Sequence, residues 1–374
     1  MDKSRIKIAY IISSLVKQGP VQVMFDIICN MDFNKFDVSI ITLGKEKSNS
    51  LEDKFRELPI RLVKYDAYCK YNFLFHSIKI SNFIKNNNIE IIHSHCFRSM
   101  IYSHYCKGTA KHIHTIHVYP GMQLYSMNGY ILGLILSIII KFLLRKIDYP
   151  IACSKSIADD LRQKDNIAVS YITNGICLAK SLKNKSELRK ELNLKNDIIY
   201  FLSLGRFSPE KNFKVLVEAF IRSNLLNSKL IILGEGKTFH EVKNISNENV
   251  ILAGFKNNVN DYLNASDFYI STSLTEGMPL SVLEAMSMGL PLIISDIPPH
   301  REIFEKSPNM LIGILFNNTK QDSIIDAINT MGKHKFHKTL SNNVKYIFNT
   351  YFSADMMSNN YQNAYKSTLI YKVK

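Results

Sequence analysis

Short apolar runs alternate with longer segments of helical periodicity along almost the whole chain. The runs are rich in Ile and Val, and the gap between one run and the next leaves room for a helix. This alternation is typical of parallel strands that helices cover on both faces. The predicted strands cover residues 6–12, 38–43, 60–64, 89–95, 112–118, 150–153 and 170–172 in the first half, and 198–204, 229–233, 250–252, 268–271, 291–295 and 311–315 in the second.

Two such series predict an α/β protein with two tandem Rossmann-like, doubly wound domains. We assign residues 1–177 to the first domain and 178–350 to the second, and we expect 351–374 to form a helix that packs back on the first. The polar segment 178–197 is the best linker candidate, with a short helix inside it. Doubly wound sheets bind ligands at the carboxyl ends of their strands, so we expect a substrate in a cleft between the domains.

One segment departs from this pattern. Residues 121–140 contain no charged side chain, 130–140 are almost wholly apolar, and Lys141, Arg145 and Lys146 follow. Polar residues dilute the first part, which argues against a membrane-spanning helix of about twenty apolar residues. A buried core helix and an interfacial helix among lipid headgroups both remain open, and Lys141 suits the second because its stem can snorkel.

The chain is basic, with 47 Lys and Arg against 32 Asp and Glu, a net charge of +15. Such an excess is compatible with nucleic acid, an anionic membrane surface or an anionic substrate. Lysines outnumber arginines by 37 to 10, whereas proteins that read bases favour Arg, so we expect no nucleic-acid partner. Residues 1–175 hold +9 of the excess, which favours an acceptor at an anionic membrane surface.

The six cysteines are scattered and form no C-x-x-C pair, which indicates a reducing compartment rather than a disulfide framework. The start of the chain resembles a signal peptide, but Lys7 interrupts its apolar run and no small-x-small cleavage site follows. We therefore expect residues 6–12 to form a strand, and the protein to be cytoplasmic and peripheral on the inner face of the cell membrane.

The first predicted strand of the second half leads into a turn that carries two cations. Gly205 lets the backbone turn, Ser208 is a suitable N-cap, and Pro209 suits the first position of a helix. Arg206 and Lys211 flank the turn. A planar guanidinium and a compact ammonium beside a helix N-terminus can hold a diphosphate.

Residues 271–296 have the same plan with carboxylates: a strand leads to a Gly-containing turn, and Pro279 opens a helix. Glu276, in the turn, can accept hydrogen bonds from sugar hydroxyls. Glu284, in the helix, can bind the two hydroxyls of a ribose, as the acidic residue does in dinucleotide-binding folds. The backbone N–H groups at 278–280 could face a phosphate.

Together these features resemble the retaining GT-B glycosyltransferases of the large family numbered four. The resemblance follows the order and spacing of motifs across the entire second half. The motifs are E-x7-E from Glu276 to Glu284, G-R-x4-K-N from Gly205 to Asn212, T-N-G at 173–175, L-G-E-G at 233–236 and A-G-F at 253–255.

The resemblance implies a nucleotide-sugar donor bound mainly by the second domain. Arg206 and Lys211 would hold the diphosphate, Glu284 the ribose and Glu276 the donor sugar, and the backbone near 255–256 would meet the base. The implied donor-binding residues are Gly19, Gly205, Arg206, Lys211, Phe255, Lys256, Gly277, Met278, Pro279, Leu280 and Glu284, and the implied catalytic residues are His117, Arg206, Lys211 and Glu276.

The first half matches the family less closely. Where the family usually has a Gly-Gly turn after the first strand, this chain has Gln18 and Gly19, and Gly19 stays a donor-site candidate. His117 matches the family's histidine that meets the donor sugar. His95, at the end of a predicted strand, could line the acceptor side.

Six of the eleven histidines lie between residues 93 and 117. Strand alternation puts His93 with His95, and His112 with His114, on common faces. No nearby Cys or carboxylate completes a zinc site with the usual spacing, and no D-x-D motif, Walker loop, G-x-S-x-G or G-x-G-x-x-G is present. We therefore expect no metal and no cofactor, with the cations stabilising the leaving diphosphate.

These observations predict a retaining glycosyltransferase that moves a hexose-type sugar from a nucleoside-diphosphate sugar to an acceptor hydroxyl. The expected acceptor is a lipid-linked oligosaccharide in capsule, O-antigen or exopolysaccharide synthesis. In the family's proposed mechanism the departing phosphate oxygen takes the acceptor proton, which agrees with the lack of an evident nucleophile–base pair. Two alternatives remain: a non-hydrolysing nucleotide-sugar epimerase of the same fold, and a non-catalytic sugar-nucleotide-binding protein.

Overall fold

The computed structural model describes residues 5–65, 73–121, 124, 129–178, 183–333 and 337–370. The chain forms two compact units, residues 1–175 with 354–374, and residues 176–353. These limits lie within three residues of the predicted boundaries at 177 and 350. Two sequence predictions fall partly outside the described residues, namely the centre of the predicted linker (179–182) and the start of the uncharged segment (122–123 and 125–128).

The first unit contains a seven-stranded parallel sheet with the order β3-β2-β1-β4-β5-β6-β7. The order reverses direction between β1 and β4, which is the topological switch point of a doubly wound sheet. The strands are β1 (Ile6–Ile12), β2 (Phe36–Thr42), β3 (Arg61–Lys64), β4 (Ile91–Ser94), β5 (Lys111–Ile116), β6 (Tyr149–Ala152) and β7 (Ser170–Tyr171).

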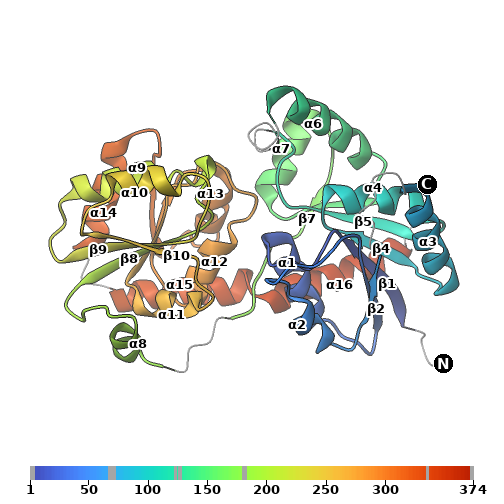
Figure 1. Cartoon of the computed structure of the whole chain (residues 1–374), viewed down its shortest axis with the longest axis horizontal. Coiled ribbons are helices and arrows are strands. Elements are labelled where there is room, and N and C mark those ends of the chain that lie inside the picture. Colours follow the sequence, from blue (N-terminus) through green and yellow to red (C-terminus); the bar gives the residue numbers. More distant parts are fainter. Residues whose placement is uncertain are drawn as a thin grey trace. The chain divides into compact units, whose positions relative to one another are not determined.

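Helices cover this sheet, and the last one comes from the far end of the chain (Figure 1). They are α1 (Gly19–Cys29), α2 (Glu52–Arg56), α3 (Phe73–Asn86), α4 (Phe97–Cys106), α6 (Tyr130–Leu144), α7 (Lys155–Asp165) and α16 (Ala354–Ile370). Two hydrogen bonds anchor α16: the Ser358 hydroxyl donates to the Ile27 carbonyl (2.7 Å), and the Tyr365 hydroxyl meets that of Tyr10 (2.6 Å). The C-terminal helix is therefore an integral part of the first unit.

The second unit repeats the plan with a six-stranded parallel sheet of order β10-β9-β8-β11-β12-β13. Its switch point lies between β8 and β11. The strands are β8 (Ile199–Leu204), β9 (Ser228–Leu233), β10 (Val250–Gly254), β11 (Phe268–Ser271), β12 (Leu292–Ser295) and β13 (Gly313–Phe316). Every strand predicted from the apolar runs is confirmed, with ends displaced by a few residues at most.

The helices of the second unit pack an apolar core against the sheet. In α9, for example, Leu216, Val217 and Phe220 recur at helical spacing and are buried against Phe201 of β8. The helical segments are α8 (Lys185–Glu191), the 3₁₀ turn Pro209–Lys211, α9 (Phe213–Ser223), α10 (Phe239–Ile245), α11 (Val259–Ala265), α12 (Leu280–Ser287), α13 (Pro298–Glu305), α14 (Gln321–Gly332) and α15 (His337–Tyr351).

The predicted linker segment 178–197 contains the expected short helix, but its described part from residue 183 on belongs to the second unit. The Asn184 and Glu187 side chains form a capping box that starts α8. Arg189 then reaches into the unit: its side chain is 6% exposed and lies 2.7 Å from Asp267. A buried, ion-paired arginine ties this segment to the second unit, so charge content alone misled the prediction.

Helix α6 confirms the apolar segment as a helix but excludes the buried-core interpretation. Its small and polar residues face the protein, where the Ser137 hydroxyl donates to the Pro120 carbonyl (2.5 Å). Lys141 forms an ion pair with Asp165 (2.7 Å) and is largely covered, so the expected snorkelling of Lys141 is also wrong. Leu143 and Leu144, at its end, are also buried, but eight large side chains are 38–76% exposed: Tyr130, Ile131, Leu132, Leu134, Ile135, Ile138, Ile139 and Phe142. Among the described residues, no helix is long and apolar enough to cross a membrane.

Candidate functional site

The turn after β8 brings Lys211 back toward the end of the strand. Ser208 and Pro209 open a 3₁₀ turn rather than the predicted α-helix, and the Ser208 side chain makes no cap hydrogen bond. Asn212 adopts a left-handed backbone (φ 53°), and α9 begins only after it. The stem of Lys211 consequently lies over Gly205, where an added Cβ would come within 2.9 Å of its Cε.

One glycine-containing loop, at residues 233–236, supports this turn. The Gly205 N–H donates to the Leu233 carbonyl (3.0 Å), and the Phe207 N–H donates to the Glu235 carbonyl (2.9 Å). Gly234 has φ +138°, and a Cβ there would lie 1.8 Å from the Gly205 carbonyl oxygen. The L-G-E-G motif thus has a structural explanation, because only a glycine permits this close approach of two backbones.

The turn after β11 places Glu276 against Lys211. The Lys211 Nζ lies 2.6 Å from Glu276 Oε1, and the Ser273 hydroxyl donates to the same oxygen (2.7 Å). The hydroxyl of Thr272 donates to the backbone carbonyls of Lys211 and Asn212 (both 3.1 Å), which fixes the two turns together. Burial acts to raise the pKa of Glu276, but the Lys211 charge and hydrogen bond outweigh it and hold that pKa below its usual range.

A buried histidine is linked to Glu276 through two serines, Ser295 and Ser273. The Ser295 hydroxyl donates to the Ser273 carbonyl (2.6 Å), and His300 Nδ1 donates to the Ser295 carbonyl (2.7 Å). His300 is fully buried, and burial lowers its pKa to about 4 despite the nearby Glu276 charge. Sequence analysis missed His300, although its place just after the carboxyl end of β12 was a usable signal.

The other predicted donor residues of the second unit differ in burial and in the element that carries them. Arg206 is exposed beside Gly205, while Gly277, Met278 and Pro279 are buried where the turn enters α12. Leu280 and Glu284 lie half-buried on α12 itself.

Phe255 (53% exposed) and Lys256 follow β10, two strands away from β8. The structure thus joins Lys211 to Glu276 directly. It records no hydrogen bond from Phe255 or Lys256 to that pair among the described residues.

Three predicted residues belong to the first unit, where they follow the adjacent strands β1, β4 and β5. Gly19 is the exposed first residue of α1, and Pro20 follows it in the first turn. His95 and His117 each come directly after a strand, and their rings are hydrogen-bonded (Nδ1 to Nε2, 3.1 Å). These residues therefore lie at the switch point of the first sheet, where doubly wound folds bind ligands.

The histidines of β4 and β5 belong to a buried polar network. His93 bonds to the Tyr365 hydroxyl and to Thr115 (both 2.8 Å), and the Ser94 hydroxyl bonds to His112 and to His114 (both 2.8 Å). These three histidines and the two hydroxyl residues in the strands are each at most 6% exposed. Most of the cluster therefore holds the sheet and α16 together.

His95 takes a different place from the acceptor-facing one suggested by the sequence. Its side chain is only 1% exposed, and its ring lies between those of Tyr10, His93 and His117. A ring enclosed in this way touches protein on every side rather than a substrate.

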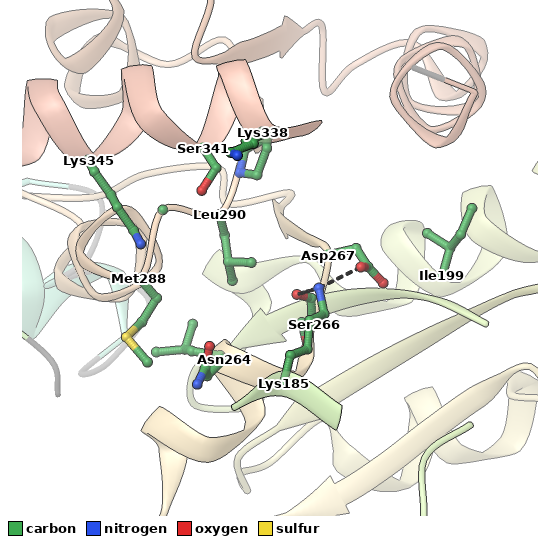
Figure 2. Close-up of a pocket in the computed structure, with 13 residues that line it drawn as sticks. Lys185, Ile199, Asn264, Ser266, Asp267, Met288, Leu290, Lys338, Ser341 and Lys345 are labelled. Atoms are coloured by element: carbon green, nitrogen blue, oxygen red, sulfur yellow. Dashed lines mark hydrogen bonds and ion pairs between the residues drawn. The ribbon is translucent and has the colours of Figure 1, made fainter. Parts of the chain in front are cut away.

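A cavity of roughly 360 Å³ lies elsewhere in the second unit (Figure 2). It opens at the amino ends of β8, β11 and β12, beside Ile199, Asp267 and Pro291. Figure 2 shows Lys185 bonded to Asp267 in its wall. Because this edge of the sheet is opposite to the one that carries Lys211 and Glu276, the cavity is not the candidate donor site.

Models of known protein families match both halves of the chain. Residues 184–347 match the family described as Glycosyl transferases group 1, and residues 18–180 match Glycosyltransferase Family 4. The chain is 26% identical over 367 residues to an Escherichia coli UDP-Gal:alpha-D-GlcNAc-diphosphoundecaprenol alpha-1,3-galactosyltransferase, covering 91% of this chain and 92% of that protein. It is also 26% identical to the Escherichia coli O-antigen biosynthesis glycosyltransferase WclY, covering 97% and 98%.

Solved structures show the same fold. The chain superposes on Anabaena HepE, solved in complex with UDP and glucose, with a TM-score of 0.80 and 16% identity, over 97% of this chain and 100% of that one. A glycosyltransferase from Rickettsia africae gives a TM-score of 0.79 and 16% identity, over 99% and 100%. At this identity the likeness concerns the architecture of the two units.

Proposed function

The chain belongs to the family 4 glycosyltransferases of the GT-B fold, and from this premise we propose that it is a retaining enzyme that transfers a hexose from a nucleoside-diphosphate sugar to an acceptor hydroxyl. The observation that carries the proposal is the Lys211–Glu276 ion pair at the β8/β11 switch point. It places a cation and a carboxylate where a doubly wound sheet receives a nucleotide.

Each residue of the proposed donor site has a separate role. Lys211 and Arg206 bind the oxygens of the diphosphate and stabilise the negative charge that grows as it leaves. Glu276 keeps its charge, because Lys211 lowers its pKa, and accepts hydrogen bonds from hydroxyls of the donor sugar. Glu284, on α12, binds the ribose.

In the transfer step the bond between the anomeric carbon and the phosphate oxygen breaks. The acceptor oxygen bonds to the same face of that carbon, and its proton passes to the departing phosphate oxygen. No side-chain base and no metal is required in this scheme, because Lys211, Arg206 and the first-turn amides of α12 receive the charge.

A donor panel tests the proposal. The protein is incubated with UDP- and GDP-sugars, with and without a diphosphoundecaprenol-linked sugar, and nucleotide release and product are measured. We expect acceptor-dependent release, a product that keeps the donor's anomeric configuration, and unchanged activity in EDTA. Inversion would refute the retaining mechanism, and a free isomerised nucleotide sugar formed without acceptor would indicate an epimerase.

We propose that the acceptor is a lipid-linked glycan reached from the inner face of the cell membrane. The E. coli relative named above acts on a diphosphoundecaprenol-linked sugar. Helix α6 offers an outward apolar face of eight large side chains, with exposed Arg145 and Lys146 directly after it. Apolar side chains beside cations are the features that place a helix in the headgroup layer of an anionic bilayer.

Vesicle flotation tests this part separately. We expect the protein to float with vesicles that contain phosphatidylglycerol and less with purely phosphatidylcholine vesicles. The double substitution Ile131→Asn and Ile138→Asn should abolish flotation without lowering the melting temperature, because both side chains are exposed (76% and 60%). Leu226→Asn is the matched control, since Leu226 is 80% exposed in the second unit. Equal flotation of the double variant and the control would exclude α6 as the membrane contact.

A further inference from the structure

The two histidines that directly follow β4 and β5 form a pair of contacting rings. His95 Nδ1 lies 3.1 Å from His117 Nε2, and the ring centroids are 5.3 Å apart. One hydrogen bond between two imidazoles holds one proton, so one ring donates and the other accepts. Which ring donates decides the tautomer of both.

Burial decides the direction of this hydrogen bond. His95 is 1% exposed, and its other nitrogen, Nε2, has no hydrogen-bond partner among the described residues. Burial, with the neighbouring His93 and His117, keeps the pKa of His95 well below its usual range, so the ring is neutral and carries a single N–H.

If that proton were on Nε2, a buried N–H would have no acceptor, which is rarer in proteins than a buried acceptor without a donor. The proton therefore belongs on His95 Nδ1, which donates to His117. His117 Nε2 accepts, so the proton of this second neutral ring is on its Nδ1.

The backbone of His117 is also held. The Cys153 thiol donates to the His117 carbonyl oxygen (3.4 Å), and Cys153 directly follows β6, the next strand of the sheet. Side-chain and main-chain contacts from β4 and β6 thus fix a half-buried His117 at the carboxyl edge of the first sheet.

We propose that His95 is a positioning residue, which holds His117 as the Nδ1–H tautomer so that His117 donates a hydrogen bond to an oxygen atom of the bound substrate. The inference rests on the proposed function for the identity of the substrate, a nucleotide sugar or its acceptor. It assigns His95 a role through His117, with no substrate contact of its own.

The first test needs no substrate. Nitrogen-15 spectra of the ¹⁵N-histidine-labelled full chain, at pH 7.5, distinguish protonated from unprotonated ring nitrogens, and a His117→Gln spectrum assigns the His117 signals. We expect His117 to show a protonated Nδ1 and an unprotonated Nε2. A protonated Nε2 on His117 would overturn the proposal, whatever the activity of the enzyme.

The second test uses two substitutions of almost equal shape. In His95→Asn the amide N–H₂ can replace the Nδ1 donor, whereas His95→Leu removes it. We expect His95→Asn to keep kcat within about threefold of the wild type, and His95→Leu to lower kcat roughly tenfold with little change in the donor KM, as for loss of one hydrogen bond to the reacting groups. Equal kcat in the two variants would refute the positioning role.

Matched controls separate this role from a loss of structure. His112, near the start of β5, is equally buried, but its ring bonds to the Ser94 hydroxyl and not to His117. His112→Asn and His112→Leu should therefore affect the melting temperature alone. Wild-type enzyme without any transferase or donor-hydrolysis activity would be a failure of the proposed function. Active wild type with an unaffected His95→Leu variant would be a failure of this inference only.

Discussion

Replacing Lys211 with Met should reveal how strongly the candidate site depends on its ion pair. Met keeps most of the aliphatic stem that packs over Gly205 but removes the charge next to Glu276. Because Ser273 is the other recorded donor to that carboxylate oxygen, Glu276 would be left with one neutral hydrogen bond. We expect a loss of stability together with a loss of turnover.

The size of the effect follows from distance and burial. At 2.6 Å and an effective dielectric constant near 20, the Coulomb attraction is about 6 kcal/mol. Desolvation of the two ions offsets much of it, and removing one partner of a buried pair costs about 3–5 kcal/mol. The side chains here are 20% and 15% exposed, so water relieves part of that cost and we expect about 2–3 kcal/mol. For a unit of this size this lowers the melting temperature by about 5–10 °C.

Calorimetry as a function of pH tests the electrostatic origin of the loss. In the wild type the folded-state pKa of Glu276 is lowered, so its contribution is present above the unfolded value of about 4.5 and disappears as the pH falls through the folded value. In Lys211→Met the charge that lowers the pKa of Glu276 is lost, while burial still raises that pKa. The pKa of Glu276 therefore rises, and protonation of Glu276 stabilises the variant. The gap between the two melting temperatures should therefore narrow from pH 7 to pH 4.5.

The double variant Lys211→Met, Glu276→Gln is the control, because it removes both charges. It should regain at least half of the lost stability yet stay at least 100-fold below wild-type turnover. A gap that is independent of pH, or a double variant with the summed losses of the single ones, would show that packing rather than charge pairing causes the effect.

Three further outcomes follow from the same structure. Arg189→Ala should cost about 3–5 kcal/mol of unfolding free energy and lower the melting temperature of the second unit by about 6–15 °C in a calorimetric scan. Lys185→Ala is the comparison: its side chain is 42% exposed, so the melting temperature should change by less than 2 °C. Gly234→Ala should weaken binding of UDP or GDP at least tenfold in calorimetric titration, because its Cβ would displace the turn that carries the cations; unchanged binding would refute the role given to that glycine. Burial lowers the pKa of His114 and of His300 to about 4, so the stability that each contributes above pH 6.5 falls by about 1.4 kcal/mol per pH unit on acidification toward pH 4. Urea titrations at several pH values should therefore show that the unfolding free energy of His114→Gln depends less steeply on pH than that of the wild type.

The sequence predicted the strands because buried parallel strands are continuous apolar runs, a signal that needs no tertiary information. It also brought Lys211 and Glu276 into one hypothesis, since each follows the carboxyl end of a strand. Their contact could not be predicted, because it depends on the 3₁₀ turn that replaces the expected helix start at Ser208.

Other errors have the same origin in tertiary contacts. A charged segment reads as a linker unless the Arg189–Asp267 pair is known. A helix with one wholly apolar stretch can be predicted to be buried, because the sequence does not show that the Lys141–Asp165 pair turns the opposite face toward the protein. His300 was missed because its position after the carboxyl end of β12 was the one signal of it in the sequence, and its burial and its hydrogen bond to the Ser295 carbonyl depend on tertiary structure.

The position of helix α16 at the end of the chain affects the order in which the two units can fold during translation. Tyr361 and Tyr365 complete the hydrogen bonds of Thr115 and His93, yet they are translated after the entire second unit. Until they emerge, the nascent first unit contains buried polar groups without partners and an uncovered apolar surface on α1. The second unit is contiguous and can fold as soon as it has left the exit tunnel, so the N-terminal half of this enzyme should be the last to become protease-resistant, and the one that depends on chaperones.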